Sequence, residues 1–102
     1  MIQKQTAFDP ATPSSVHLLL TERLRLEVRR AIEERNLTQV AAGRILGMAQ
    51  PRVSALLRGR RSGVSAERLL QCLTALGRDV EVRIKPADDR DCGLLCVTSA
   101  GA

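Results

Sequence analysis

Hydrogen-bonding side chains recur on one side of a short segment near the middle of the chain. A helix over residues 50–58 would turn its apolar residues Val53, Leu56 and Leu57 toward a core. Its outer face would then carry Gln50, Arg52, Ser54, Ala55 and Arg58. Side chains of these types match the donors and acceptors that base edges present in the major groove of DNA. The outer face of this helix is therefore suited to the major groove, with the arginines matching guanine and Gln50 matching adenine.

The positive charge of the chain is concentrated around this segment. The 102 residues include 16 Lys and Arg and 11 Asp and Glu, which gives a formal net charge of +5. No acidic residue lies between Asn36 and Ala66, but this stretch contains Arg44, Arg52, Arg58, Arg60 and Arg61. The charges of the other residues cancel, so the whole excess lies here. A basic surface without acids favours phosphate binding, and we predict phosphate contacts from Arg60 and Arg61. An ordinary solvated loop is the alternative for these two.

Two short helices joined by a glycine turn are predicted to position these side chains. Thr38 is suited to cap a helix over Gln39–Leu46, whose buried side would consist of Ala41, Ala42, Ile45 and Leu46. Gly47 can adopt the positive φ that ends this helix. Pro51 fits the first turn of the following helix. Simple packing of two bundle helices is the alternative interpretation.

Longer amphipathic segments flank this pair of helices. A helix from about Leu18 to Arg35 would bury Leu20, Leu24, Val28, Ala31 and Ile32. Glutamates alternate in it with four arginines that are predicted to lie on a solvated face: Arg23, Arg25, Arg29 and Arg30. Ser65 is suited to cap a further helix that extends to about Leu76. Residues 1–17 contain two prolines and show no apolar period, which predicts a flexible arm.

Residues 79–85 have the alternating pattern of a strand. Val80, Val82 and Ile84 lie on one face, and Pro86 follows directly. A lone strand leaves its backbone N–H and C=O groups unpaired, so we predict pairing with the same strand of a second copy in a homodimer. Two alternatives stay open: Gly93–Val97 could fold back as a second strand, or the edge could bind a different protein. Residues 87–102 are predicted to form a mobile tail.

The segment LTQVAAGRILGMAQPRVSALLRGR resembles the Xre/Cro family of helix-turn-helix regulators. It is most similar to small antitoxin-like members that end in a strand of the DVEVRIKP kind. The resemblance covers about residues 18–86 and rests on Leu37–Gln39, Gly47, Gln50–Ser54 and Leu57–Gly59. It implies a mainly α, four- to five-helix Cro/lambda-repressor-like domain with a C-terminal strand. It also implies that the second helix of the motif lies in the major groove, with phosphate contacts from Thr38 and Gln39. The base contacts that it implies come from Gln50, Arg52, Ser54 and Arg58.

Two residues depart from the pattern of this family. Ala49 stands where a capping Ser or Thr is usual, a change that costs about 1 kcal/mol of helix stability. Gly43 stands where Ala is usual, which is expected to weaken its helix slightly. We expect both to reduce the rigidity of the motif without preventing the fold.

Few residues could support catalysis or a metal site. His17 is the only histidine, and Cys72, Cys92 and Cys96 lack the spacing of a zinc site. The single aromatic residue, Phe8, argues against stacking on RNA bases or sugars. We therefore expect no enzymatic activity, no cofactor and no metal. No segment has the pattern of a signal peptide or a membrane span, so a cytoplasmic location without membrane contact is expected.

These features predict a sequence-specific DNA-binding regulator of transcription, most simply a dimeric repressor. The expected partners are double-stranded DNA and a second copy of the chain. The resemblance implies a rival function, an antitoxin that neutralises a ribonuclease-type toxin and also represses its own operon. The expected organisation is an arm over 1–17, a DNA-binding and dimerisation domain over 18–86 and a tail over 87–102.

Overall fold

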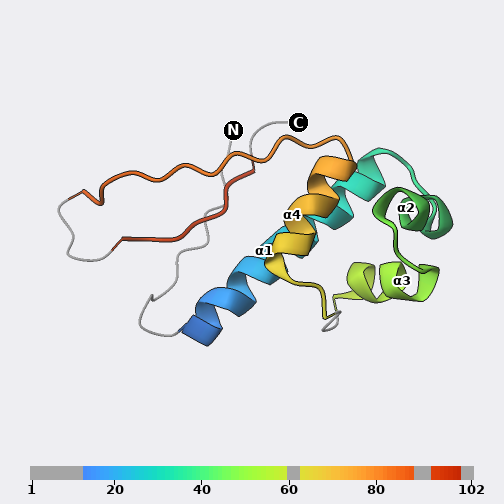
Figure 1. The fold of residues 1–102 in the computed structure, drawn as a ribbon, viewed down its shortest axis with the longest axis horizontal. Helices are drawn as coiled ribbons and strands as arrows, with labels where there is room; N and C mark the ends of the chain where they lie inside the picture. The colour runs from blue at the N-terminus through green and yellow to red at the C-terminus, as the bar shows by residue number, and fades with distance from the viewer. Residues whose placement is uncertain (1–12, 60–62, 89–92, 100–102) are drawn as a thin grey trace.

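The described part of the chain folds into four helices followed by an extended segment. The computed structural model describes residues 13–59, 63–88 and 93–99, with side chains from Leu19 onward. The helices are α1 (Pro13–Glu34), α2 (Gln39–Leu46), α3 (Gln50–Arg58) and α4 (Ala66–Ala75). α1 and α4 pack side by side, and α2 and α3 lie together on one side of this pair (Figure 1). The mainly helical fold with a helix-turn-helix pair is therefore confirmed.

α1 is longer than the sequence pattern predicted. It begins at Pro13, five residues before the expected start at Leu18, so residues 13–17 belong to the helix. Proline is favoured in a first turn because the N–H group that it lacks has no partner there. At the other end, Asn36 adopts a left-handed φ of 51°. The Leu37 N–H then donates to the Ile32 carbonyl (3.2 Å), which ends the helix in a Schellman turn.

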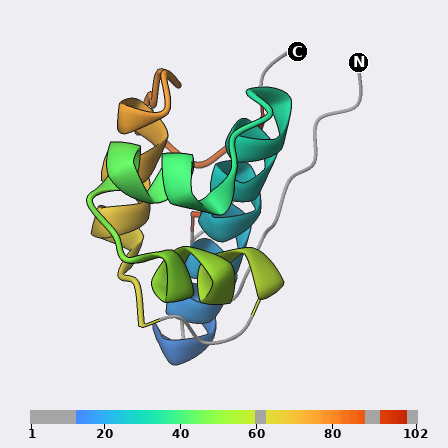
Figure 2. The ribbon, with the colours of Figure 1, turned by 90° about the vertical axis from the view of Figure 1, so that its right-hand side faces the viewer.

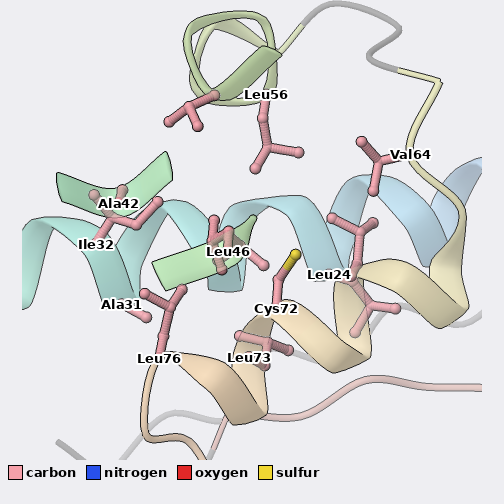
Figure 3. Packing of buried hydrophobic residues seen from close by; sticks show 13 residues of the cluster. Leu24, Ala31, Ile32, Ala42, Leu46, Leu56, Val64, Cys72, Leu73 and Leu76 are labelled. Atoms are coloured by element: carbon pink, nitrogen blue, oxygen red, sulfur yellow. The ribbon is translucent and has the colours of Figure 1, made fainter. Parts of the chain in front are cut away.

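A single aliphatic core joins the four helices. It consists of Leu24, Val28, Ala31, Ile32, Ala42, Leu46, Val53, Leu56, Val64, Leu69, Cys72, Leu73 and Leu76 (Figure 3). Cys72 is fully buried among these side chains, and burial raises the pKa of its thiol. The prediction that Ile45 is buried is wrong, since its side chain is 37% exposed. The core contacts of α2 come from Ala42 and Leu46 instead, and Ile45 lies at the margin.

α4 is capped at its start as the sequence indicated, and the residues that follow its end are bonded to α1. The Ser65 hydroxyl accepts a hydrogen bond from the Arg68 N–H (3.1 Å). After Gly77, which has a φ of 87°, Arg78 donates to the Glu34 carboxylate at the end of α1. Together with Arg30, this bond holds the pKa of Glu34 below its usual value.

The segment after α4 is extended but is not hydrogen-bonded as a strand. From Arg78 it runs away from α2 and α3, and residues 93–99 return toward the helices (Figure 1). Within the described residues, neither 79–85 nor 93–97 forms a strand, so the predicted strand and the alternative of an internal hairpin are not observed there. Val97 packs against the core, and Ser99 is hydrogen-bonded to Arg23 and Glu27 of α1.

None of the helices within the described part of the chain combines the length and the apolar character needed to cross a membrane.

Candidate nucleic-acid interface

α3 presents the four predicted base-contact residues on its accessible side. Val53 and Leu56 are completely buried and fix the inner face of the helix on the core. Gln50, Arg52 and Arg58 are exposed, and Ser54 is half-buried. Figure 2 faces this part of the molecule and shows α2 and α3 lying in front of α1 and α4. Contacts of these side chains with DNA remain a prediction.

The turn between α2 and α3 depends on two glycines. Gly47 has a φ of 67°, in the left-handed region that favours glycine, and ends α2. The Met48 N–H then donates back to the Gly43 carbonyl at 2.9 Å. A Cβ added at Gly43 would lie only 2.6 Å from the Met48 carbonyl oxygen. Gly43 is therefore more than a weakly helical substitute for alanine, because the close turn leaves no room for a methyl group.

The two motif helices begin differently, as the sequence indicated. The Thr38 hydroxyl accepts a hydrogen bond from the Ala41 N–H (3.0 Å) and caps α2. Ala49 at the start of α3 provides no side-chain cap. Instead, the Gln50 side-chain amide donates to the Gln39 side-chain carbonyl and links the starts of the two helices. A predicted base-contact residue and a predicted phosphate-contact residue are thus hydrogen-bonded to each other.

The arginines of the structure separate into bonded and unbonded groups. Eight of those described form ion pairs or hydrogen bonds with protein atoms: Arg23, Arg25, Arg29, Arg30, Arg35, Arg68, Arg78 and Arg83. Arg44, Arg52 and Arg58 are exposed and make no such bond with another residue that the structure describes. All three lie on α2 or α3. Arg60 and Arg61, which are predicted to contact phosphates, fall outside the described residues.

Arg25 does not lie on a solvated face, so that prediction is wrong. Its side chain is buried, and Nη1 donates to the Leu56 carbonyl in the last turn of α3 (2.9 Å). Nε and Nη2 both donate to the Glu22 carboxylate, at 3.0 and 2.7 Å. These bonds hold the pKa of Glu22 below its usual value. The available signal was helical position, because Arg25 precedes the buried Val28 and Ile32 by three and seven residues.

A second arginine supports the motif from α4. Arg68 donates to the Leu46 carbonyl at the end of α2 and also contacts Gln71 (3.4 Å). The last four carbonyls of a helix have no partner within it, and cations are favourable near this end. Each motif helix therefore has a guanidinium from a flanking helix bonded to a carbonyl of its last turn.

Comparison with known proteins agrees with this geometry. A family described as a helix-turn-helix domain matches residues 8–85. A solved structure named as a transcriptional regulator of the XRE family has a similar fold, with a TM-score of 0.80 and 35% sequence identity. That match covers 86% of this chain and 100% of the other. No match was found among curated proteins. This chain belongs to the helix-turn-helix family of Xre-type regulators.

Proposed function

We propose that this protein is a sequence-specific, double-stranded DNA-binding regulator of transcription. The observation that carries the proposal is the placement of Arg44, Arg52 and Arg58. These exposed guanidinium groups have no partner among the described residues, and all lie on the two motif helices. An arginine without an internal partner retains all its donors for phosphate oxygens or for the paired acceptors of guanine. The resemblance to an XRE family transcriptional regulator supports the same function.

The hydrogen bonds at the starts of α2 and α3 leave donors and acceptors available for phosphates and bases. Thr38 uses its hydroxyl oxygen as an acceptor, so its hydroxyl proton remains free for a phosphate. Gln39 accepts from Gln50 through its carbonyl, which leaves its amide protons as phosphate donors. Gln50 keeps its carbonyl and one amide proton, the pair that adenine recognition requires.

Selection of bound duplexes from a randomised DNA pool, followed by sequencing, tests this proposal. A sequence-specific dimer should enrich an inverted repeat whose half-sites are about one helical turn, ~34 Å, apart. Salt-sensitive binding with no enriched motif would contradict sequence-specific recognition and leave only non-specific association.

We further propose that residues 79–85 pair with the same segment of a second copy, so that the regulator is a homodimer. Val82 and Ile84 are 75% and 92% exposed, and Val80 is 37% exposed. No backbone hydrogen bond joins this segment to another residue within the described ranges. An antiparallel strand from a second copy would satisfy those backbone groups and cover the apolar side chains. A dimer bound across a promoter would exclude polymerase, which makes repression the simplest regulatory effect.

Light scattering after size-exclusion chromatography tests the dimer. The wild type should have twice the chain mass, and Val82→Asp with Ile84→Asp should be a monomer with an unchanged helical circular dichroism spectrum. The control exchanges the charges of the opposite face, Glu81→Arg with Arg83→Glu, and should stay dimeric. A wild-type monomer would contradict the dimer. If that monomer formed a stable complex with a small basic protein encoded beside it, the antitoxin function would be favoured instead.

A further inference from the structure

The last turn of α3 is held by a side chain from α1. Arg25 is only 7% exposed, and its Nη1 atom lies 2.9 Å from the carbonyl oxygen of Leu56. This carbonyl is one of the last four in α3, which have no hydrogen-bond partner within the helix. The positive guanidinium also lies at the negative end of the helix dipole. Arg25 therefore stabilises the last turn of α3 both by a hydrogen bond and by its charge.

Gly59 completes the fit between the end of α3 and this guanidinium. Its φ of 80° favours glycine, and a Cβ there would lie 3.0 Å from Nη2 of Arg25. The backbone after α3 thus rests closely on the guanidinium group. Arg58 lies between the two anchored points, Leu56 and Gly59.

Glu22 fixes the plane of the guanidinium. Its two carboxylate oxygens accept from Nε at 3.0 Å and from Nη2 at 2.7 Å, and the pair forms within α1 at a spacing of three residues. Two parallel bonds set an orientation that a single bond cannot. The pair Arg29–Glu33 on the same helix is different, because both side chains are about half exposed or more, and neither forms a hydrogen bond or ion pair with the described residues of α3.

We propose that the Glu22–Arg25 pair is a positioning device for DNA recognition, which sets the direction of the last turn of α3 and hence of Arg58. Neither residue contacts DNA in this proposal. The inference rests on the proposed function, since it assigns a role in base discrimination to residues behind the recognition helix. A pair that only stabilised the fold would change specific and non-specific DNA affinity in equal proportion.

The test compares Glu22→Gln and Arg25→Lys with matched changes in the exposed pair, Glu33→Gln and Arg29→Lys. Each glutamate variant removes one negative charge from α1, so the general attraction to DNA rises equally in both. Fluorescence anisotropy measures the affinity for the selected duplex and for a scrambled duplex, at a temperature where circular dichroism shows folded protein. We expect Glu22→Gln and Arg25→Lys to lower the ratio of the two affinities by about five- to tenfold, within the range of one lost base contact. The control variants should leave the ratio unchanged.

A double-mutant cycle shows whether the pair acts through Arg58. If it does, Glu22→Gln should have little further effect on the affinity ratio once Arg58→Ala is present, because the side chain that it positions is gone. Glu22→Gln keeps the Arg25 donor to Leu56, so this cycle remains informative even if Arg25→Lys does not fold. Independent, additive effects of Glu22→Gln and Arg58→Ala would overturn the assignment.

The two levels of the proposal fail in different ways. If the wild type selects a DNA sequence and Glu22→Gln binds the selected duplex as well as Glu33→Gln does, only the positioning role is wrong. If the wild type enriches no sequence, the proposed function fails and the positioning role fails with it.

Discussion

α3, which we propose as the recognition helix, and the extended segment 79–88 differ in how the rest of the chain holds them. α3 has Val53 and Leu56 fully buried and a guanidinium from α1 on its last turn. The extended segment has Val82 and Ile84 largely exposed, and its backbone makes no hydrogen bond to another residue in the described part of the chain. Arg78, the residue before this segment, donates a hydrogen bond to Glu34 of α1.

The difference separates a region that is held by contacts within one chain from a region that is not. The helix-turn-helix pair is positioned by contacts from α1 and α4, so its geometry does not need a partner. The extended segment is apolar and has no backbone partner among the described residues, and we propose that a second copy pairs with it. We therefore expect substitutions in the two regions to affect different properties, stability of the single chain in one case and association in the other.

The largest expected effect on stability comes from truncating a buried side chain of α3. Leu56→Ala should lower the free energy of unfolding by about 2–5 kcal/mol, because it leaves a cavity beneath the recognition helix. Chemical denaturation followed by circular dichroism measures this. Ile84→Ala is the matched change in the extended segment, and in the isolated chain it should alter that free energy by under about 0.5 kcal/mol. If the two variants lost similar amounts of unfolding free energy under conditions where the protein is monomeric, the difference between the two regions would be contradicted.

The close turn between α2 and α3 gives the next effect. Gly43→Ala should destabilise the protein by about 1–3 kcal/mol, because the new methyl group meets the Met48 carbonyl and the backbone has to shift. In this net value, the cost of the clash outweighs the gain of about 1 kcal/mol that alanine brings to a helix interior. Gly93→Ala, with no atom within 4 Å of the added Cβ, is the control and should be neutral or slightly stabilising. A stabilised Gly43→Ala protein in thermal unfolding would show that the turn is looser than described.

A missing cap offers a gain of stability in the same motif. Ala49 has φ −66° and ψ 147°, close to the values of the capping residues Thr38 and Ser65. Ala49→Ser should therefore raise the free energy of unfolding by about 0.5–1 kcal/mol by supplying an acceptor at the start of α3. Ser65→Ala should lower it by a similar amount, since it removes the bond to the Arg68 N–H. An unchanged or lower melting temperature for Ala49→Ser would contradict this.

The smallest expected effect is a dependence on pH. The pKa of Glu22 is lowered in the fold from its ordinary value of 4.5, chiefly by hydrogen bonds from Arg25. Its contribution to stability is thus present above that ordinary value and is lost as pH falls through the lower, folded value. Because Glu22 is about half exposed, we expect the difference between wild type and Glu22→Gln to be under about 1 kcal/mol at neutral pH. It should shrink in unfolding experiments as pH falls below the ordinary value of 4.5, and a constant difference would contradict the assignment.

The sequence predicted the motif because its signals are local. Thr38 and Ser65 as caps, Gly47 at the turn and the apolar positions of α3 all depend on residues within a few positions of one another. The location of Gln50, Arg52 and Arg58 on the accessible side of α3 followed from the same period.

Other features depend on contacts between distant parts of the chain. Arg25 looks like its neighbours Arg23 and Arg29 in sequence, and only the packing of α3 against α1 separates it from them. The need for glycine at position 43 comes from the carbonyl of Met48 across the turn. The alternating pattern predicted a strand over residues 79–85, but strand formation depends on backbone groups outside the segment. The described residues supply no such groups, so its pairing with a second copy is a proposal.

The central claim is that α3 reads bases, and Arg58 tests it most directly. Affinities are measured for the selected duplex and for versions with each base pair changed, using the wild type, Arg58→Ala and Arg60→Ala. We expect Arg58→Ala to lose discrimination at one position of each half-site, worth about 1–3 kcal/mol, and to bind the altered sites almost normally. Arg60→Ala should weaken all sites alike and reduce the salt dependence. If Arg58→Ala also weakened every site equally, Arg58 would contact only phosphates, and the claim that this part of α3 reads bases would be contradicted.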